Sequence, residues 1–177
     1  VSRFGDGEFQ MITHYLQQGK IEDFHVDTFQ SYSPLLAKKL IEVFESNLEG
    51  LLLCIPYAFK KSSVYRGYDR IFFEREWLLR KNFICSRIRN KKIQFGDTCF
   101  TRFWMKRTDI LDYSAYVALL KQIWDKRDVI FLEGEQSRLG VGNDLFENAT
   151  SIPRFLFPSI NAFQRYEDIL KVVQELP

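Results

Sequence analysis

The stretch Glu133-Gly-Glu-Gln-Ser-Arg-Leu-Gly-Val-Gly-Asn-Asp-Leu-Phe146 decides how the rest of this chain is interpreted. It follows an apolar run over residues 128–132, which predicts a buried strand of the kind found in parallel sheets. A strand that leads through a glycine-rich turn to the start of a helix is a common way for α/β proteins to bind phosphate groups. The stretch therefore favours an α/β fold with an anion site.

The turn itself contains the residues expected to make that site. Gly140 and Gly142 allow positive φ angles or close approach of a ligand to the backbone. Asn143 or Asp144 is expected to cap a short helix over residues 145–149. Arg138 could reach phosphate oxygens with its guanidinium group. A tight strand-to-helix connection with a solvated arginine accounts for the same pattern equally well, because the stretch has neither the dinucleotide-binding fingerprint nor the Walker pattern.

Composition narrows the class of protein. The chain has 177 residues, of which 46% are hydrophobic and 27% charged, as expected for one soluble globular domain. The net charge of +2 gives no basic surface that indicates nucleic acid as a partner. No apolar run is long enough for a transmembrane segment. The three cysteines fit neither a disulfide framework nor a zinc site, which favours a reducing cytoplasm.

Predicted strands and helices alternate along the whole chain. This order predicts a mainly parallel sheet covered by helices on both faces, in one domain over residues 1–177. The start at Val1 without a methionine suggests a domain excised from a longer chain. Ligands of such sheets bind at the carboxyl ends of the strands, so one site built from the loops at that edge is expected. The strands are expected near residues 3–4, 51–55, 128–132 and 154–157, and the helices near 9–16, 34–44, 69–89, 113–126 and 165–176.

Two carboxylates follow the first predicted strand. Asp6 and Glu8 are separated by one glycine, and in an extended segment their side chains would share a face. Both could then bind one hard cation such as Mn²⁺ or Mg²⁺, which also binds phosphate oxygens. The alternative is an ordinary surface turn, since Gly-Asp-Gly is common turn chemistry.

Three other polar residues lie where a ligand could contact them. Glu133 is placed to act as a catalytic base, Arg102 to hold a phosphate, and Asn161 to contact a base or sugar. A solvated loop acid, a surface arginine and a helix cap are the respective alternatives. His14 and His25 have no partner at catalytic or metal-binding spacing, so both are expected to be structural or exposed.

Two motifs together resemble those of the bacterial glycosyltransferases of the GT-D fold. These are Arg3-Phe-Gly-Asp-Gly-Glu8 and the stretch 133–146, and the resemblance continues through residues 151–163 and more weakly through 101–102. The family is a former domain of unknown function found in enzymes that glycosylate serine-rich-repeat adhesins. The chain departs from the expected pattern at Phe103, where a proline is anticipated, which bears on the acceptor side of the site.

The resemblance implies a Rossmann-like sheet and sugar transfer from a nucleotide diphosphate donor, typically UDP-glucose. It implies that Asp6 and Glu8 hold a divalent metal, and that Arg3, Ser137 and Arg138 lie near the donor. It also implies a glycan or glycoprotein acceptor, further glycosyltransferase domains as partners, and a bacterial cytoplasmic location that includes the inner face of the membrane.

The sequence leads to metal-dependent glycosyl transfer as the first hypothesis. An inverting transfer would need a base, for which Glu133 is the candidate, whereas a retaining transfer would not. A metal-dependent phosphotransferase or phosphatase with Asp6 as nucleophile is the second hypothesis. A non-catalytic module that binds nucleotide sugars or glycans is the third.

Overall fold

A computed structural model describes residues 1–17, 29–88, 94–102, 105 and 107–176. These residues form two compact units. Unit 1 comprises the described residues within Val1–His25 and Tyr32–Leu111, and unit 2 those within Val26–Ser31 and Asp112–Pro177. Among the described residues, no helix has the length and apolar character that crossing a bilayer requires.

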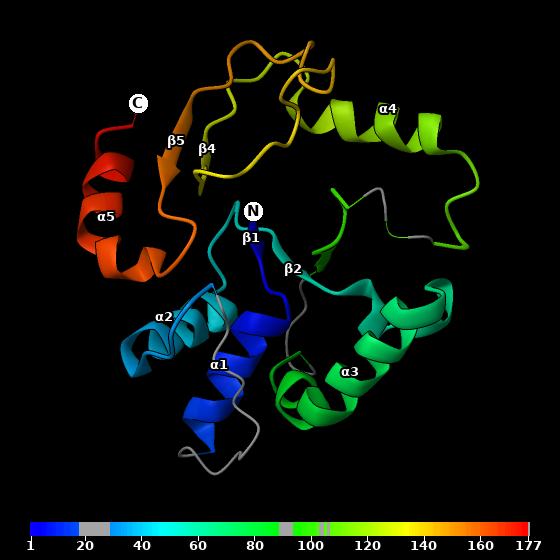
Figure 1. Ribbon diagram of the computed structural model, residues 1–177, viewed down its shortest axis with the longest axis vertical. Coiled ribbons are helices and arrows are strands. Elements are labelled where there is room, and N and C mark those ends of the chain that lie inside the picture. The colour runs from blue at the N-terminus through cyan, green and yellow to red at the C-terminus, as the bar shows by residue number, and fades with distance from the viewer. Residues whose placement is uncertain (18–28, 89–93, 103–104, 106, 177) are drawn as a thin grey trace. The chain divides into compact units, whose positions relative to one another are not determined.

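Unit 1 is built on a three-stranded parallel sheet in the order β1-β2-β3 (Figure 1). Ser2 of β1 pairs with Leu53 of β2, and Cys54 of β2 pairs with Gly96 of β3. Because the strands are parallel, the segments that follow them leave from the same edge of the sheet. The strands are β1 (Ser2–Arg3), β2 (Leu53–Ile55) and β3 (Gly96–Asp97).

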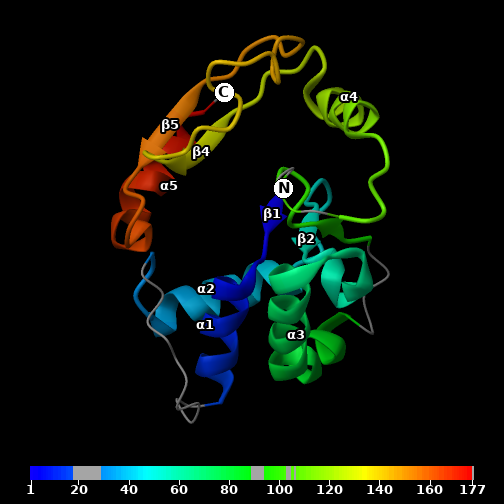
Figure 2. The same ribbon diagram turned by 45° about the vertical axis from the view of Figure 1, so that its right-hand side comes forward.

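Three α-helices accompany this sheet, and α1 packs against both α2 and α3 (Figures 1 and 2). As predicted, α2 begins at Pro34, and Ser33 caps it by accepting a hydrogen bond from the Leu36 N–H at 3.3 Å. Short 3₁₀ helices fill the connection between β2 and α3. The helices are α1 (Asp6–Leu16), α2 (Pro34–Glu45), η1 (Tyr57–Phe59), η2 (Ser62–Val64) and α3 (Gly67–Ile88).

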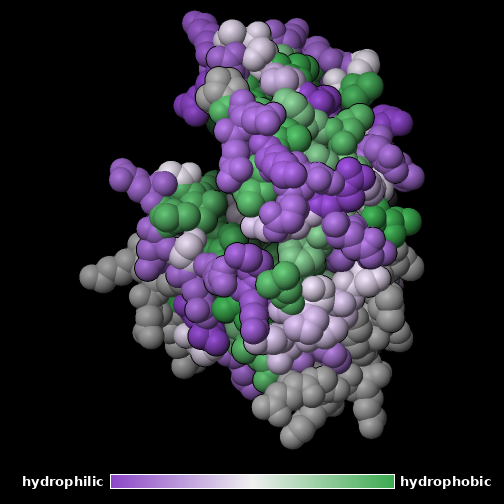
Figure 3. Space-filling view, turned by 90° about the vertical axis from the view of Figure 1, so that its left-hand side faces the viewer, coloured by the Kyte–Doolittle hydropathy of each residue, from purple (hydrophilic) through white to green (hydrophobic). Residues whose placement is uncertain are grey.

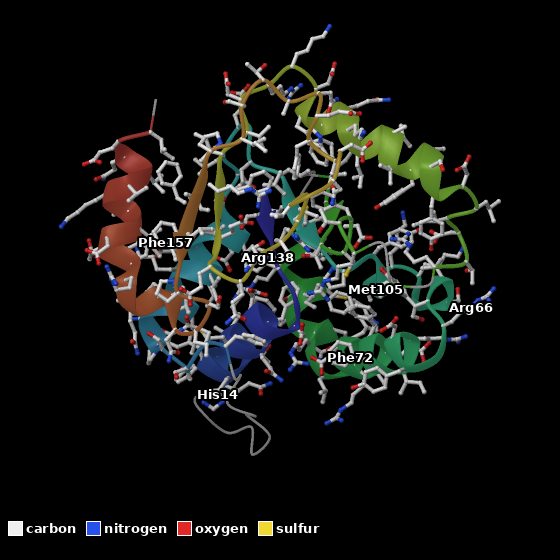
Figure 4. The ribbon with its side chains drawn as sticks, turned by 45° about the horizontal axis from the view of Figure 1, so that its top comes forward. His14, Arg66, Phe72, Met105, Arg138 and Phe157 are labelled. Atoms are coloured by element: carbon white, nitrogen blue, oxygen red, sulfur yellow. The ribbon has the colours of Figure 1, made fainter. Side chains whose placement is uncertain are left out.

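Two hydrophobic clusters stabilise unit 1. The first joins β1 and β2 to all three α-helices, and its aromatic rings meet edge to face: Phe44 lies 5.0 Å from Phe4 and 5.5 Å from Phe9 between ring centroids. The second lies between η2, α3 and the segment after β3, and Figure 4 labels two of its members, Phe72 and Met105. The segment after β3 is therefore held by core packing.

Unit 2 contains a two-stranded parallel sheet, with Phe131 paired to Arg154 and Gly134 paired to Phe157. Helix α5 lies along one side of this sheet (Figures 1 and 2). Asp112 caps α4 by accepting a hydrogen bond from the Ala115 N–H at 3.0 Å. The elements are α4 (Tyr113–Trp124), β4 (Phe131–Gly134), β5 (Arg154–Phe157), η3 (Ala162–Arg165) and α5 (Tyr166–Gln174).

The predicted α/β class and its parallel strands are confirmed, and the described strands divide between two sheets. The predicted helix over residues 145–149 is wrong, because turns occupy that segment. Ala37 and Phe44 are the buried residues of α2, whereas Val43 is 37% exposed. On the face shown in Figure 3, hydrophobic side chains stand among hydrophilic ones. All three cysteines are free thiols, as expected.

Candidate functional site

The turn between β1 and α1 presents Asp6 and Glu8 in a different way from the one predicted. Helix α1 begins at Asp6, so the two carboxylates lie in its first turn and not in an extended segment. The Glu8 side chain folds back and accepts a hydrogen bond from the Gly5 N–H at 2.7 Å, as in a capping box. Residues two apart in a helix point away from each other, so the expected common face does not form.

This arrangement does not fit a cation shared by the two side chains. Asp6 is exposed, but Glu8 is partly buried and already satisfies the cap N–H. Among the described residues, no cluster of three or more histidine, cysteine, aspartate or glutamate side chains is placed to hold a metal ion. Asp6 is thus the only one of the predicted pair whose side chain is open to a ligand.

Asp97, at the carboxyl end of β3, organises the same edge of the sheet. Its Oδ1 accepts hydrogen bonds from the backbone N–H of Tyr57 at 3.2 Å and of Cys99 at 3.0 Å. Its Oδ2 accepts a hydrogen bond from Arg107 Nη1 at 2.5 Å. One carboxylate therefore fixes both the segment after β2 and the segment after β3. Asp97 is not among the residues predicted from the sequence, although an aspartate at the end of a buried strand is a usable signal.

Hydrogen bonds and aromatic rings fix the Arg107 side chain. Its Nε and Nη2 donate to the Asp109 carboxylate at 2.9 and 2.7 Å, and its guanidinium lies 5.0 Å from the Tyr57 ring and 5.5 Å from the Tyr65 ring. Burial raises the pKa of the Tyr65 hydroxyl well above its ordinary value. Burial likewise raises the pKa of the Cys99 thiol to about 11. Both groups are therefore neutral at physiological pH and serve the packing of this segment.

Arg3 and the segment after β3 meet at this edge. Arg3 Nη1 donates a hydrogen bond to the Thr101 hydroxyl at 3.2 Å, and its guanidinium lies 5.4 Å from the Phe100 ring. Arg3 and Arg102 also both lie near enough to Cys99 to oppose the rise in its pKa. Both arginine side chains are exposed, whereas Thr101 is buried. Arg3 and Arg102 thus lie at the edge of the sheet from which α1 starts, and the first backbone N–H groups of a helix have no helical acceptor.

In unit 2, the predicted glycine turn is organised by Arg154. This guanidinium donates to the Glu133 carboxylate and to the Leu139 carbonyl, both at 2.5 Å. It also lies over two aromatic rings, 4.7 Å from Phe131 and 5.7 Å from Phe146. The Glu133 side chain is only 12% exposed. Its present partner is an arginine, and its action as a base stays a prediction.

The two glycines of the turn both adopt the positive φ angles predicted for them. Gly140 has φ +72° and Gly142 has φ +76°. A Cβ on Gly140 would stand 2.2 Å from the Phe146 ring, whereas a Cβ on Gly142 would meet nothing within 4 Å. Gly140 is therefore required both for its backbone conformation and for the close approach of Phe146.

Turns, and not the predicted helix, occupy residues 145–149 after these glycines, so the helix start expected at this turn is missing. Asn143 Oδ1 accepts a hydrogen bond from the Leu145 N–H at 2.9 Å, and the Leu145 carbonyl accepts one from Trp124 Nε1 at 2.9 Å. These bonds satisfy the backbone without helical pairing. Asp144 forms an ion pair with Lys121 at 2.9 Å.

The remaining predicted contacts of unit 2 lie in loops. Arg138 is exposed on the loop after β4 (Figure 4), and its Nη1 donates to the carbonyls of Glu135 at 3.2 Å and Ser137 at 2.7 Å. Asn161 has φ +53°, and its Oδ1 accepts a hydrogen bond from the Ser31 N–H at 2.7 Å. Asn161 thus binds a neighbouring chain segment in this structure. Contact of these residues with a donor stays a prediction.

Two of the residues singled out in the sequence cannot be placed. His25 and Phe103 lie outside the described residues. His14, in contrast, meets the Tyr32 ring at 4.6 Å between centroids, which agrees with the structural role predicted for it.

Comparison with solved structures supports the fold. One similar structure is described as "The highly conserved domain of unknown function 1792 has a distinct glycosyltransferase fold"; it is 36% identical with a TM-score of 0.80. Another, described as "A New Glycosyltransferase (DUF1792) from Streptococcus sanguinis", is 31% identical with a TM-score of 0.76. The alignments cover 99% of this chain and 59% and 62% of those chains, respectively.

Curated relatives agree with this grouping. The chain is 32% identical over 186 residues to "Probable glycosyl transferase Gly" of Streptococcus gordonii and 29% identical over 177 residues to "Glycosyltransferase GlyD" of Streptococcus pneumoniae. It spans only 24% and 20% of their lengths. The family described as "Glycosyltransferase GT-D fold" matches residues 1–177. This chain therefore belongs to the glycosyltransferase GT-D fold family.

Proposed function

We propose that this chain transfers a hexosyl group, glucose in the first instance, from a UDP-sugar to a glycan or glycoprotein acceptor. Membership of the GT-D family supports the reaction class, and the names of the similar proteins agree with it. The donor carries a diphosphate, whose negative charge grows as the glycosidic bond breaks. A donor site must therefore offer fixed positive charge or hydrogen-bond donors at that position.

The hydrogen bond between Arg3 and Thr101 is the observation that carries the proposal. It joins Arg3, which is expected near the donor, to the segment that contains Arg102, which is expected to hold a phosphate; the two bonded residues are 98 positions apart in sequence. Arg3 and Arg102 each bring an exposed guanidinium to the edge where α1 begins. One guanidinium group can donate two hydrogen bonds to a phosphate at the same time, and the first N–H groups of α1 add further donors.

In this proposal the carboxylate of Asp97 acts through the segment that it anchors. Its bonds to the Tyr57 and Cys99 N–H groups hold the two loops that border Arg3 and Arg102. Because Arg107 pairs with Asp97 and packs on Tyr57, the loops are fixed before a donor arrives. Such preorganisation lowers the conformational cost of binding.

Isothermal titration of UDP and UDP-glucose into the purified chain tests the proposal, with Mn²⁺ present and then with EDTA. We expect binding by the wild type. Arg3→Gln should weaken it roughly 10- to 150-fold, the range that corresponds to about 1.5–3 kcal/mol for a hydrogen bond to a charged group. Arg66→Gln serves as the control, since Arg66 is exposed at the periphery of unit 1 in Figure 4.

Absence of UDP binding, or equal binding by wild type and Arg3→Gln, would contradict the proposed donor site. The EDTA titration tests separately the Mn²⁺ or Mg²⁺ requirement expected from the sequence, and Asp6→Asn identifies the contribution of that carboxylate. Phosphate release from simple monoesters without sugar dependence would instead support a phosphatase. Donor binding without turnover across many acceptors would support a binding module.

A further inference from the structure

A hollow lies in unit 1, apart from the residues proposed to bind the diphosphate. It has a volume of about 350 Å³ and is bordered by η1, η2 and the middle of α3. This volume falls within the usual range for small-molecule sites, roughly 300–1,000 Å³. The chain enters this region directly from β2 through Pro56, so the wall formed by η1 begins at the carboxyl edge of the sheet.

An aromatic pair forms the apolar side of the hollow. The Phe59 and Trp77 rings lie 5.2 Å apart between centroids, with 32° between their planes. Both side chains are partly buried and pack against the first hydrophobic cluster of unit 1, which fixes their orientation. A rigid aromatic surface of this kind packs well against the flat C–H face of a pyranose ring.

Polar groups form the other side. The Glu74 Oε1 accepts hydrogen bonds from Ser62 Oγ and Arg70 Nε, both at 2.8 Å. Both bonds lower the pKa of Glu74 below its ordinary value, and the bond from Arg70 has the larger effect. Glu74 therefore stays ionised, and its second oxygen can accept a hydrogen bond from a ligand hydroxyl. The exposed Lys60, which also borders the hollow, supplies N–H donors.

We propose that this hollow binds a neutral pyranose ring. The inference rests on the proposed function, because the ring would belong to either the donor or the acceptor of the transfer. Glu74 disfavours an anionic ligand, and a purely apolar ligand would leave Glu74 and Lys60 desolvated without partners. A sugar offers hydroxyl groups to both and an apolar face to Trp77, so it satisfies every type of group in the wall.

Ligand-observed NMR titration with methyl α-glucopyranoside and methyl α-galactopyranoside tests the proposal without requiring turnover. We expect saturable binding of at least one glycoside by the wild type. Glu74→Gln and Trp77→Ala should each weaken it at least about tenfold, as expected when a central contact of roughly 1.4 kcal/mol is lost. Leu79→Ala is the control, because Leu79 is 58% exposed on the same helix and does not border the hollow.

Circular dichroism would verify that each variant folds. If Trp77→Ala does not fold, Glu74→Gln alone still decides the test. Absence of saturable binding, or equal binding by wild type and Glu74→Gln, would overturn the proposal. In turnover assays, a higher KM for the acceptor alone assigns the ring to the acceptor, and a higher KM for UDP-glucose alone assigns it to the donor. Unchanged KM values for both would refute its part in the transfer.

The two proposals fail in different ways. A wild type that neither binds UDP nor transfers sugar would contradict the proposed function, whatever its affinity for glycosides. A wild type that transfers sugar but whose glycoside binding is insensitive to Glu74 would contradict the pyranose site alone.

Discussion

Substituting Gly140 by alanine should damage unit 2 through two separate effects. With φ +72°, an alanine would occupy the left-handed region at a cost of about 1–2 kcal/mol. Its Cβ would also stand 2.2 Å from Phe146 Cε2 and 2.3 Å from Cδ2. Phe146 cannot move aside freely, because it is 6% exposed and packs on Trp124 and Phe131. Overpacking of this kind adds about 1–3 kcal/mol.

The free energy of unfolding should therefore fall by about 2–5 kcal/mol in Gly140→Ala. Gly142→Ala is a matched control, because Gly142 has φ +76° but no neighbour within 4 Å of the added Cβ. It should lose only the backbone contribution, about 1–2 kcal/mol. Urea denaturation followed by circular dichroism measures both losses.

A double variant tests the cause of the difference. In a Phe146→Leu background, which removes most of the ring, the additional cost of Gly140→Ala should approach that of Gly142→Ala. Equal losses for Gly140→Ala and Gly142→Ala in the wild-type background would refute the reasoning, because the overlap with Phe146 would then contribute nothing.

Three further results are expected in unit 1. Asp97→Ala should destabilise the chain by about 3–5 kcal/mol, because it removes one of the two carboxylates that pair with the largely buried Arg107 and leaves the N–H groups of Tyr57 and Cys99 without their acceptor; a loss no greater than that of a surface substitution in urea denaturation would contradict this. Arg107 lowers the pKa of Asp109, so the stability that Asp109 contributes is present above its unfolded pKa and lost as pH falls through its folded pKa. The stability difference between wild type and Asp109→Asn should accordingly shrink in acid, and a difference independent of pH would argue against it. With its pKa near 11, buried Cys99 should resist iodoacetamide at pH 8 while the partly exposed Cys85 reacts, as peptide mass mapping would show; equal labelling of the two would contradict the burial argument.

Local patterns were sufficient to predict most of the elements. Ser33 followed by Pro34 predicts the start of α2, and the apolar run before Glu133 predicts a parallel strand, although β4 begins at Phe131 and not at residue 128. Glu8 stands three residues after Gly5, which is the spacing of a capping-box glutamate at the start of a helix. This signal is easily missed because Gly-Asp-Gly is also common in turns.

The contacts that shape the candidate sites were less accessible. Glu133 and Arg154 are 21 residues apart, and nothing in either segment shows that they will pair once β4 and β5 align. The same holds for Asp97 and Arg107, whose meeting depends on how the segment after β3 packs on η2 and α3. The composition of residues 145–149 is compatible with a helix. In the structure, however, Trp124 Nε1 donates a hydrogen bond to the Leu145 carbonyl, and the segment forms turns.

The bond from Ser31 to Asn161 has a consequence for how the protein is made. The two residues are 130 positions apart, yet both belong to unit 2. A ribosome that adds roughly 5–20 residues per second needs on the order of ten seconds between them. Throughout that interval the early segment of unit 2 has to wait for Asn161. Unit 2 therefore closes only after residue 161 has been added, and a fragment that starts at Asp112 would lack a piece of its own fold.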